Sequence, residues 1–212
     1  MQTSIQAITS PGNVLAWNER LLAIALAQAR NPDKQLTVID FGGGFGGHIS
    51  TFLKVARDAS YLWTVIEIPT IVEEGRKRIP PGAPVRYETE IERAPASADL
   101  VVASGALQYL PAPYEMLIRF ANVNPRPVFL DRVPFVDASE DFLTLQHVPG
   151  RYFGDGQARN VPAWWFARER FIERLESTFS IDWIAQTGEH AVVNGLSSVW
   201  EGMVVHPKRL AP

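Results

Sequence analysis

Five glycines stand within six positions of the stretch TVIDFGGGFGGHIS, which spans residues 37–50. They follow a run of strand-forming residues containing one acid, Asp40, and they precede an amphipathic run. A backbone this bare can turn tightly, and a ligand can approach it without meeting a Cβ atom. The main-chain N–H groups at the start of the following helix favour an anionic group. The stretch therefore predicts a site for the anionic part of a nucleotide-type cofactor.

The glycine spacing leaves two cofactor classes open. Gly42, Gly44 and Gly47 satisfy G-x-G-x-x-G, the pattern of dinucleotide sites, in which the anion is a pyrophosphate. Gly42, Gly44 and Gly46 equally satisfy acid-x-Gly-x-Gly-x-Gly with Asp40 as the acid. In sites of that second pattern the anion is the carboxylate of S-adenosylmethionine. The glycines alone do not decide between the two.

A second acid, Glu67, lies near the end of the next apolar run, YLWTVIEI, about 20 residues after the last glycine. An acid at that place can accept hydrogen bonds from the ribose hydroxyls of an adenosine. Glu67 is also the only acid in an otherwise apolar segment. We therefore favour ribose binding over a solvated acid at the end of a strand.

Alternating strands and helices must position these residues. The expected strands are 36–41, 61–68, 85–90, 98–105 and 126–133, and the expected helices are 13–30, 48–57, 69–79 and 114–123. Such alternation predicts an α/β fold with a Rossmann-like, doubly wound, mostly parallel sheet covered on both faces.

After Pro134 the pattern changes. Residues 134–160 read as irregular, and residues 162–179 predict a long helix. Residues 180–188 and 197–207 predict an antiparallel strand pair joined by residues 189–196. The segment 134–161 is interpreted as a lid or an acceptor-binding insertion, because ligand-contacting segments often lie on such loops.

Size and composition set further bounds. The 212 residues fit a single domain, 1–212, with an N-terminal helical segment at 1–35. The absence of cysteine excludes thiolate zinc sites and a cysteine nucleophile, and the net charge of -3 gives no case for nucleic acid as a partner. The longest apolar run, residues 21–29, is far short of the roughly 20 residues that cross a bilayer. We expect a cytoplasmic protein without membrane insertion. Both a monomer and a homodimer are compatible with the sequence.

Through Asp40, the glycines and Glu67, the sequence resembles the class I S-adenosylmethionine-dependent methyltransferases. The stretch ADLVVASGALQYLPAP, residues 98–113, is similar to the fourth motif of that family, and the family's seven-stranded sheet likewise ends with antiparallel strands. The likeness is clearest over residues 36–133. SGALQYL, LDRVP and LQHVPG also resemble a group of methyltransferases often encoded among cell-surface polysaccharide genes, which names no acceptor.

The resemblance implies a set of cofactor-binding residues. Those expected at the methionine end are Asp40, Gly42, Gly43 and Gly44, with His48 either reaching the carboxylate or capping the helix. Glu67 is expected on the ribose, Ile68 on the adenine, and Glu88 and Thr89 near the adenine edge. Those expected to border the reactive sulfonium are Ser104, Gly105 and Leu107.

Methyl transfer is an in-line displacement whose rate depends largely on placing the acceptor and the methyl group in line, and it requires no metal. An oxygen acceptor gains from a general base. The candidates for catalytic contacts are Tyr109, Asp131, Arg132 and His147. Each has a structural alternative: packing for the tyrosine, local pairing for the Asp-Arg pair and a hydrogen-bonded structural role for the histidine.

The sequence thus predicts S-adenosylmethionine-dependent methyl transfer to a small-molecule hydroxyl. An NAD(P)-dependent oxidoreductase explains the glycines and Glu67, but it does not explain Asp40, the segment SGALQYL (residues 104–110) or the final strand pair. A non-catalytic binding protein with the methyltransferase fold is the third hypothesis, because a fold does not fix a function.

Overall fold

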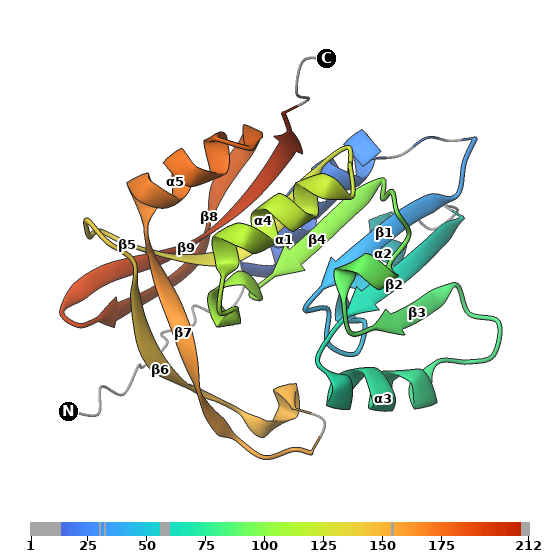
Figure 1. Cartoon of the computed structure of the whole chain (residues 1–212), viewed down its shortest axis with the longest axis horizontal. Helices are drawn as coiled ribbons and strands as arrows, with labels where there is room; N and C mark the ends of the chain where they lie inside the picture. Colours follow the sequence, from blue (N-terminus) through green and yellow to red (C-terminus); the bar gives the residue numbers. More distant parts are fainter. Residues whose placement is uncertain (1–13, 30, 32, 56–59, 154, 209–212) are drawn as a thin grey trace.

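The computed structural model describes residues 14–29, 31, 33–55, 60–153 and 155–208. Its centre is a mixed sheet, with nine strands among the described residues (Figure 1). Five strands run parallel in the order β3-β2-β1-β4-β5, with β1 at Leu36–Phe41, β2 at Tyr61–Ile66, β3 at Val85–Glu88, β4 at Leu100–Ser104 and β5 at Val128–Val136. This arrangement confirms the predicted parallel sheet.

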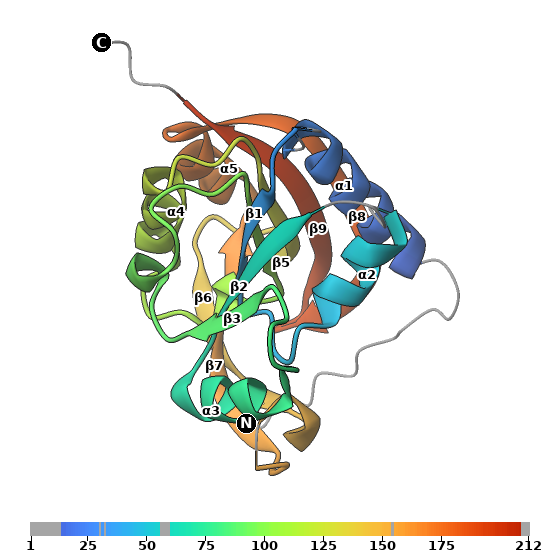
Figure 2. The same ribbon diagram turned by 90° about the vertical axis from the view of Figure 1, so that its right-hand side faces the viewer.

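Successive residues of the central strands pack into two separate cores. On one face, Val38 and Val102 pack with residues of α1 (Val14–Ala29) and α2 (Gly47–Val55). On the other face, Ile39 and Val101 pack with residues of α4 (Pro113–Asn122) and α5 (Arg168–Glu176). Figure 2 shows the sheet between these two helix pairs. Burial of both faces explains why the strands read as near-continuous apolar runs.

The chain ends in the predicted antiparallel pair. β8 (Phe179–Val193) pairs with β9 (Leu196–Pro207), and β9 runs antiparallel beside β5. The turn between them consists of Asn194 and Gly195, both with positive φ, as a two-residue hairpin turn requires. The expected connection at 189–196 was wrong in extent, because β8 continues to Val193.

The segment after Pro134 was predicted incorrectly. It forms an antiparallel hairpin of β6 (Phe142–Val148) and β7 (Arg159–Ala167), and helix α5 begins only at Arg168. The aromatic run 164–166 suits a strand, since aromatic residues are enriched in strands, and here Trp165 and Phe166 are both buried. Pro162 is tolerated because β7 pairs with β5 only at residues 166 and 167.

This hairpin, residues 142–167, supplies the two strands beyond the seven expected. It is inserted between β5 and α5, and it projects beyond the carboxyl ends of the parallel strands, on the same side as α3 (Pro69–Arg78) (Figures 1 and 2). The described residues also form three short 3₁₀ helices: η1 at Ile91–Arg93, η2 at Leu107–Tyr109 and η3 at Gly150–Tyr152. Residues 1–13 of the expected N-terminal segment lie outside the described residues. Within the described ranges, none of the helices is long and apolar enough to cross a membrane.

Gly75 provides a test of the packing between α3 and β3. A Cβ atom added to Gly75 would lie 2.5 Å from Cε1 of Tyr87. In an exposed helix, alanine in place of glycine stabilises by roughly 0.5–1 kcal/mol. Here we expect Gly75→Ala to destabilise the protein by about 1–3 kcal/mol, because the helix must move away from the ring. Urea unfolding measures the change, and the same substitution beside Tyr87→Leu should cost clearly less. An equal cost in both backgrounds would contradict this packing.

Candidate functional site

The glycine turn follows the carboxyl end of β1. Gly42 and Gly44 have φ values of 70° and 56°, which residues with a side chain rarely adopt. A Cβ atom on Gly42 would lie 2.6 Å from Cβ of Ala106, and one on Gly43 would lie 2.4 Å from Cγ of Asp40. A Cβ atom on Gly44 would meet nothing within 4 Å. Two of these glycines are therefore required by contacts within the protein, whereas Gly44 borders open space.

Asp40 lies beneath this turn and is fully buried. Its Oδ2 accepts a hydrogen bond of 3.0 Å from Nε1 of Trp63, and its Oδ1 lies 2.9 Å from Nδ1 of His48. The charge of Asp40 raises the pKa of His48, and this effect outweighs the opposing effect of burial. The two residues therefore favour a carboxylate paired with an imidazolium.

His48 is the second residue of α2, and its side chain is 29% exposed. Besides Asp40, its pKa responds to Asp131, which raises it, and to Arg132, which lowers it. The ring therefore lies within the electrostatic reach of the end of β5 as well as of β1. Among the described residues, nothing hydrogen-bonds its Nε2.

Glu67 connects the end of β2 with the glycine turn. Its Oε1 accepts a hydrogen bond of 3.1 Å from the amide of Gly44, and its Oε2 accepts one of 2.9 Å from the amide of Ile68. Burial raises the pKa of Glu67 despite these two hydrogen bonds. Each carboxylate oxygen can accept a further hydrogen bond, so ribose hydroxyls can still be bound. Ile68 is 46% exposed and offers an apolar surface beside this carboxylate.

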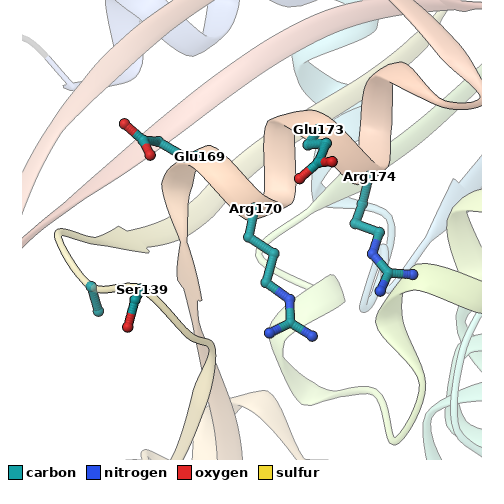
Figure 3. Close-up of a pocket in the computed structure, with 6 residues that line it drawn as sticks. Ser139, Glu169, Arg170, Glu173 and Arg174 are labelled. Atoms are coloured by element: carbon teal, nitrogen blue, oxygen red, sulfur yellow. The ribbon is translucent and has the colours of Figure 1, made fainter.

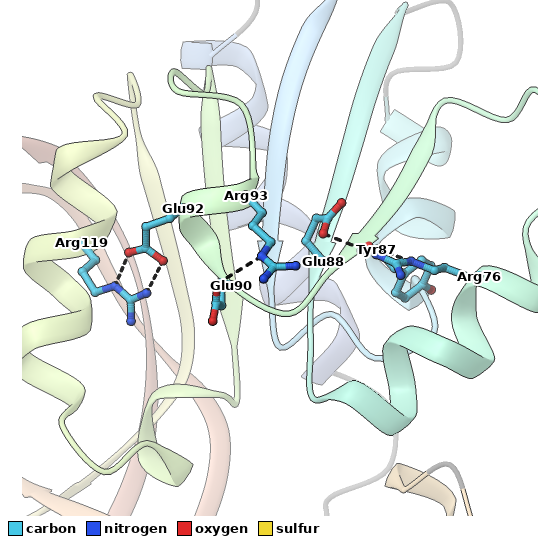
Figure 4. Close-up of polar contacts among 7 residues, drawn as sticks. All are labelled: Arg76, Tyr87, Glu88, Glu90, Glu92, Arg93 and Arg119. Atoms are coloured by element: carbon cyan, nitrogen blue, oxygen red, sulfur yellow. Dashed lines mark hydrogen bonds and ion pairs between the residues drawn. The ribbon is translucent and has the colours of Figure 1, made fainter.

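Ion pairs hold the end of β3 and the segment that follows it, as Figure 4 shows. The pairs are Arg76 with Glu88, Arg93 with Glu90 and Arg119 with Glu92. Arg119 belongs to α4 and Arg76 to α3, so the segment is tied to helices on two sides. Thr89 is exposed between the paired acids. The contacts of Glu88 and Thr89 with an adenine stay a prediction.

The ends of β4 and β5 bring together Ser104 and Asp131, which are register partners. Oγ of Ser104 donates a hydrogen bond of 2.7 Å to Oδ2 of Asp131. Asp131 is buried, and burial raises the pKa of its carboxyl group. The amide of Gly105, a residue with φ of 60°, donates to the carbonyl of Asp131. Leu107 is buried in the core, and its predicted place beside the sulfonium stays a prediction.

Arg132 occupies a bulge in β5. Its φ of 54° is rare for a residue with a side chain, and the register with β9 shifts between Leu130 and Val133. Nε of Arg132 donates to Oε2 of Glu189 at 3.2 Å. The bulge directs the arginine toward β8, while its neighbour Asp131 bonds to β4. Strained backbone of this kind is frequent at functional sites.

The hairpin is tied to η2 by two hydrogen bonds. The hydroxyl of Tyr109 donates to Oε1 of Gln146 at 3.0 Å, and Nε1 of Trp164 donates to the carbonyl of Leu110 at 3.0 Å. His147 instead forms a hydrogen bond with Asn160 across the hairpin. The structure thus brings Tyr109 to the hairpin and leaves His147 within it.

Sequence reasoning missed three partners in this region: Trp63, Gln146 and Glu189. Trp63 was detectable as the one indole donor in an apolar strand close to an acid. Gln146 and Glu189 lie in segments whose structure was predicted incorrectly, so no sequence signal pointed to their contacts.

A hollow of about 610 Å³ lies elsewhere, on the outer side of α5 (Figure 3). Its polar lining residues are Ser139, Glu169, Arg170, Glu173 and Arg174. The two acids and two bases balance in charge, and Arg170 already lies 3.8 Å from Asp141. The hollow shares no residue with the glycine turn or with the ends of β4 and β5.

No protein-family model matches the chain, and no curated protein matches it in sequence. Solved structures do resemble it. The N-terminal domain of EvdMO1 with SAH bound has 15% identity and a TM-score of 0.56, covering 94% of this chain and 82% of that one. An S-adenosylmethionine-dependent methyltransferase from Mesorhizobium loti has 11% identity and a TM-score of 0.51, covering 85% and 96%. The [4+2]-cyclase SpnF has 14% identity and a TM-score of 0.56, covering 89% and 80%.

These likenesses show the fold, which is the Rossmann-like fold of class I methyltransferases, and they confirm the predicted fold class. They do not fix the reaction, because a cyclase shares the same architecture.

The pairing of Asp40 with His48 predicts how stability depends on pH. A raised pKa in the folded state gives stability that is fully present below the usual histidine pKa of about 6.5. That stability is lost as the pH rises through the raised value. We expect the stability difference between the wild type and His48→Gln to shrink from about pH 6 to about pH 9 in urea unfolding. His190→Gln, at an exposed position of β8, is the control. A difference that stays constant with pH would refute the pairing.

Proposed function

We propose that this protein is an S-adenosylmethionine-dependent methyltransferase that acts on a hydroxyl group of a small molecule. The observation that carries the proposal is the hydrogen bond between Glu67 and the amide of Gly44. It joins the expected ribose acid to the expected carboxylate-binding turn at adjacent carboxyl ends of β1 and β2, where such folds bind ligands.

The residues present fit this cofactor. Gly44 borders open space, Glu67 retains hydrogen-bonding capacity, and Ile68 exposes an apolar side chain next to them. The main chain of the glycine turn would hold the methionine end, with the amide of Gly44 shared with Glu67. We further propose the neighbouring set Glu88, Thr89, Ser104 and Gly105 as lining residues, with Asp40 and Leu107 supporting the site from the core.

When bound, the cofactor supplies an electrophilic methyl group on a sulfonium. Asp131 is the proposed general base, because burial raises its pKa toward the working range of such a group. It would accept the proton of the acceptor hydroxyl. Arg132 and Tyr109 would line the acceptor side of the site. His147 would contact the acceptor only from its place in the hairpin.

The hairpin of residues 142–167 is proposed to cover the acceptor, which refines the lid expected at 134–161. Its contact with Tyr109 and its position beyond the carboxyl ends of the parallel strands support this role. The cytoplasmic location, the kinship with the polysaccharide-gene group and the homodimer stay predictions from the sequence. The dinucleotide alternative is weaker, because β9 is antiparallel beside β5 as in the methyltransferase fold.

Isothermal titration calorimetry tests the proposed cofactor. We expect the wild type to bind S-adenosylhomocysteine (SAH) with a dissociation constant on the order of micromolar, and to bind NAD⁺ and NADP⁺ at least about a hundredfold more weakly. Tight nicotinamide binding with no SAH binding would overturn the proposal. SAH binding without methyl transfer to a broad panel of hydroxyl compounds would favour the non-catalytic hypothesis.

Gly44→Val tests the placement of the site. A branched side chain would enter the open space and strain a left-handed backbone by about 1–2 kcal/mol, so we expect a folded protein that binds SAH at least about tenfold more weakly. Gly47→Ala is the matched control, because its Cβ atom also meets nothing and its φ is not positive. Unchanged affinity in Gly44→Val would show that the ligand lies elsewhere.

A further inference from the structure

The acid of the glycine motif does not face the open space beside Gly44. Asp40 is fully buried within β1, opposite Val65 of β2 and Val102 of β4. The backbone of Gly43 lies directly on its carboxylate, since a Cβ atom there would meet Cγ at 2.4 Å. Asp40 can therefore contact a ligand directly only if the turn moves.

The carboxylate of Asp40 is instead fixed by its own partners. A buried carboxylate must be hydrogen-bonded, and Trp63 provides one donor from β2. Trp63 is itself fully buried, and its ring packs 5.2 Å from that of Phe52. Because the indole cannot easily move, the second oxygen of Asp40 stays directed at His48. An acceptor on Nδ1 fixes the ring and leaves Nε2 as the outward group.

The charged groups around His48 favour its cationic form. Asp40 approaches from β1, and Asp131 and Arg132 act from β5. The ion pair between Arg132 and Glu189 reduces the positive charge that Arg132 presents to His48. Another carboxylate, that of Glu67, lies after β2 and contacts the glycine turn. The surroundings thus hold more negative than positive charge, in agreement with the raised pKa of His48.

We propose that Asp40 and Trp63 are positioning residues that hold His48 as an imidazolium, and that His48 binds the carboxylate at the amino-acid end of the ligand. This inference rests on the proposed function. Asp40 then acts on the ligand through His48. The affinity for ligands that carry an amino-acid carboxylate falls as the pH rises.

The same geometry argues against His48 as the general base for the acceptor. An imidazolium stabilised by a buried carboxylate has no free site to take a proton. His48 also stands one residue after the glycine turn, where the resemblance places the amino-acid end of the cofactor, whereas the acceptor side lies beyond β4 and β5.

Two ligands separate this role from a structural one. SAH carries the amino-acid end, and 5′-methylthioadenosine keeps the adenosine and the thioether without it. In calorimetry at pH 7, we expect His48→Gln to weaken SAH binding by about tenfold to a hundredfold, the effect of one charge-assisted hydrogen bond. Binding of 5′-methylthioadenosine should change by less than about twofold.

The pH dependence provides the second measurement. The affinity of the wild type for SAH should fall as the pH rises through the pKa of His48, with proton uptake on binding that is detected in buffers of different ionisation enthalpy. His48→Gln should lack this component. Asp40→Asn, which can still accept from Trp63, should move the midpoint to lower pH because the imidazolium loses its partner charge.

Each other outcome is decisive. If the wild type binds neither ligand, the proposed function fails. If the wild type binds both and His48→Gln weakens both equally, His48 is structural and the inference is wrong. If SAH binding is unchanged while methyl transfer is lost, His48 is the general base. If Asp40→Asn does not fold, an absence of proton uptake by the wild type still refutes the inference.

Discussion

The arrangement of the site depends on the buried carboxylate of Asp40. A charge without solvent needs hydrogen-bonding partners, and here an indole from β2 and an imidazole from α2 supply them. The carboxylate also leaves no room for a side chain at residue 43, so the turn must be glycine at that point. The shape of the turn is therefore set from inside the sheet, and the open space beside Gly44 follows from it.

From this point the site extends along the carboxyl edge of the sheet. Glu67 joins the turn to β2, and Ser104 and Asp131 join β4 to β5. Three carboxylates thus stand in buried or half-buried positions, and their neighbours differ: Asp40 is paired with a histidine, Glu67 accepts from two amides, and Asp131 accepts from a hydroxyl. Such differences allow one edge to hold a charge, bind hydroxyls and accept a proton.

The sequence predicted the parallel sheet because its strands are buried on both faces and read as apolar runs. It also predicted the final pair at residues 180–188 and 197–207, which agrees with the family resemblance. The hairpin of residues 142–167 was missed. A short apolar run such as Trp164, Trp165 and Phe166 can form a helix or a strand, and its partners in β6 and β5 decide. The types and spacing of Asp40 and Glu67 indicated a site. The burial of Asp40 and the positive φ of Arg132 depend on tertiary contacts that no local pattern encodes.

The protein combines a widely shared fold with an inserted hairpin, residues 142–167. The fold itself is shared by structures with different reactions, as the likeness to a cyclase indicates. The hairpin contacts η2 and pairs briefly with β5, and its residues Trp165 and Phe166 are buried in the core. Its outward side chains, such as Leu143 and Leu145, are more than half exposed. If the proposed function holds, these exposed side chains are where we expect selection among acceptors to reside, because ligand-contacting residues often lie on such peripheral segments.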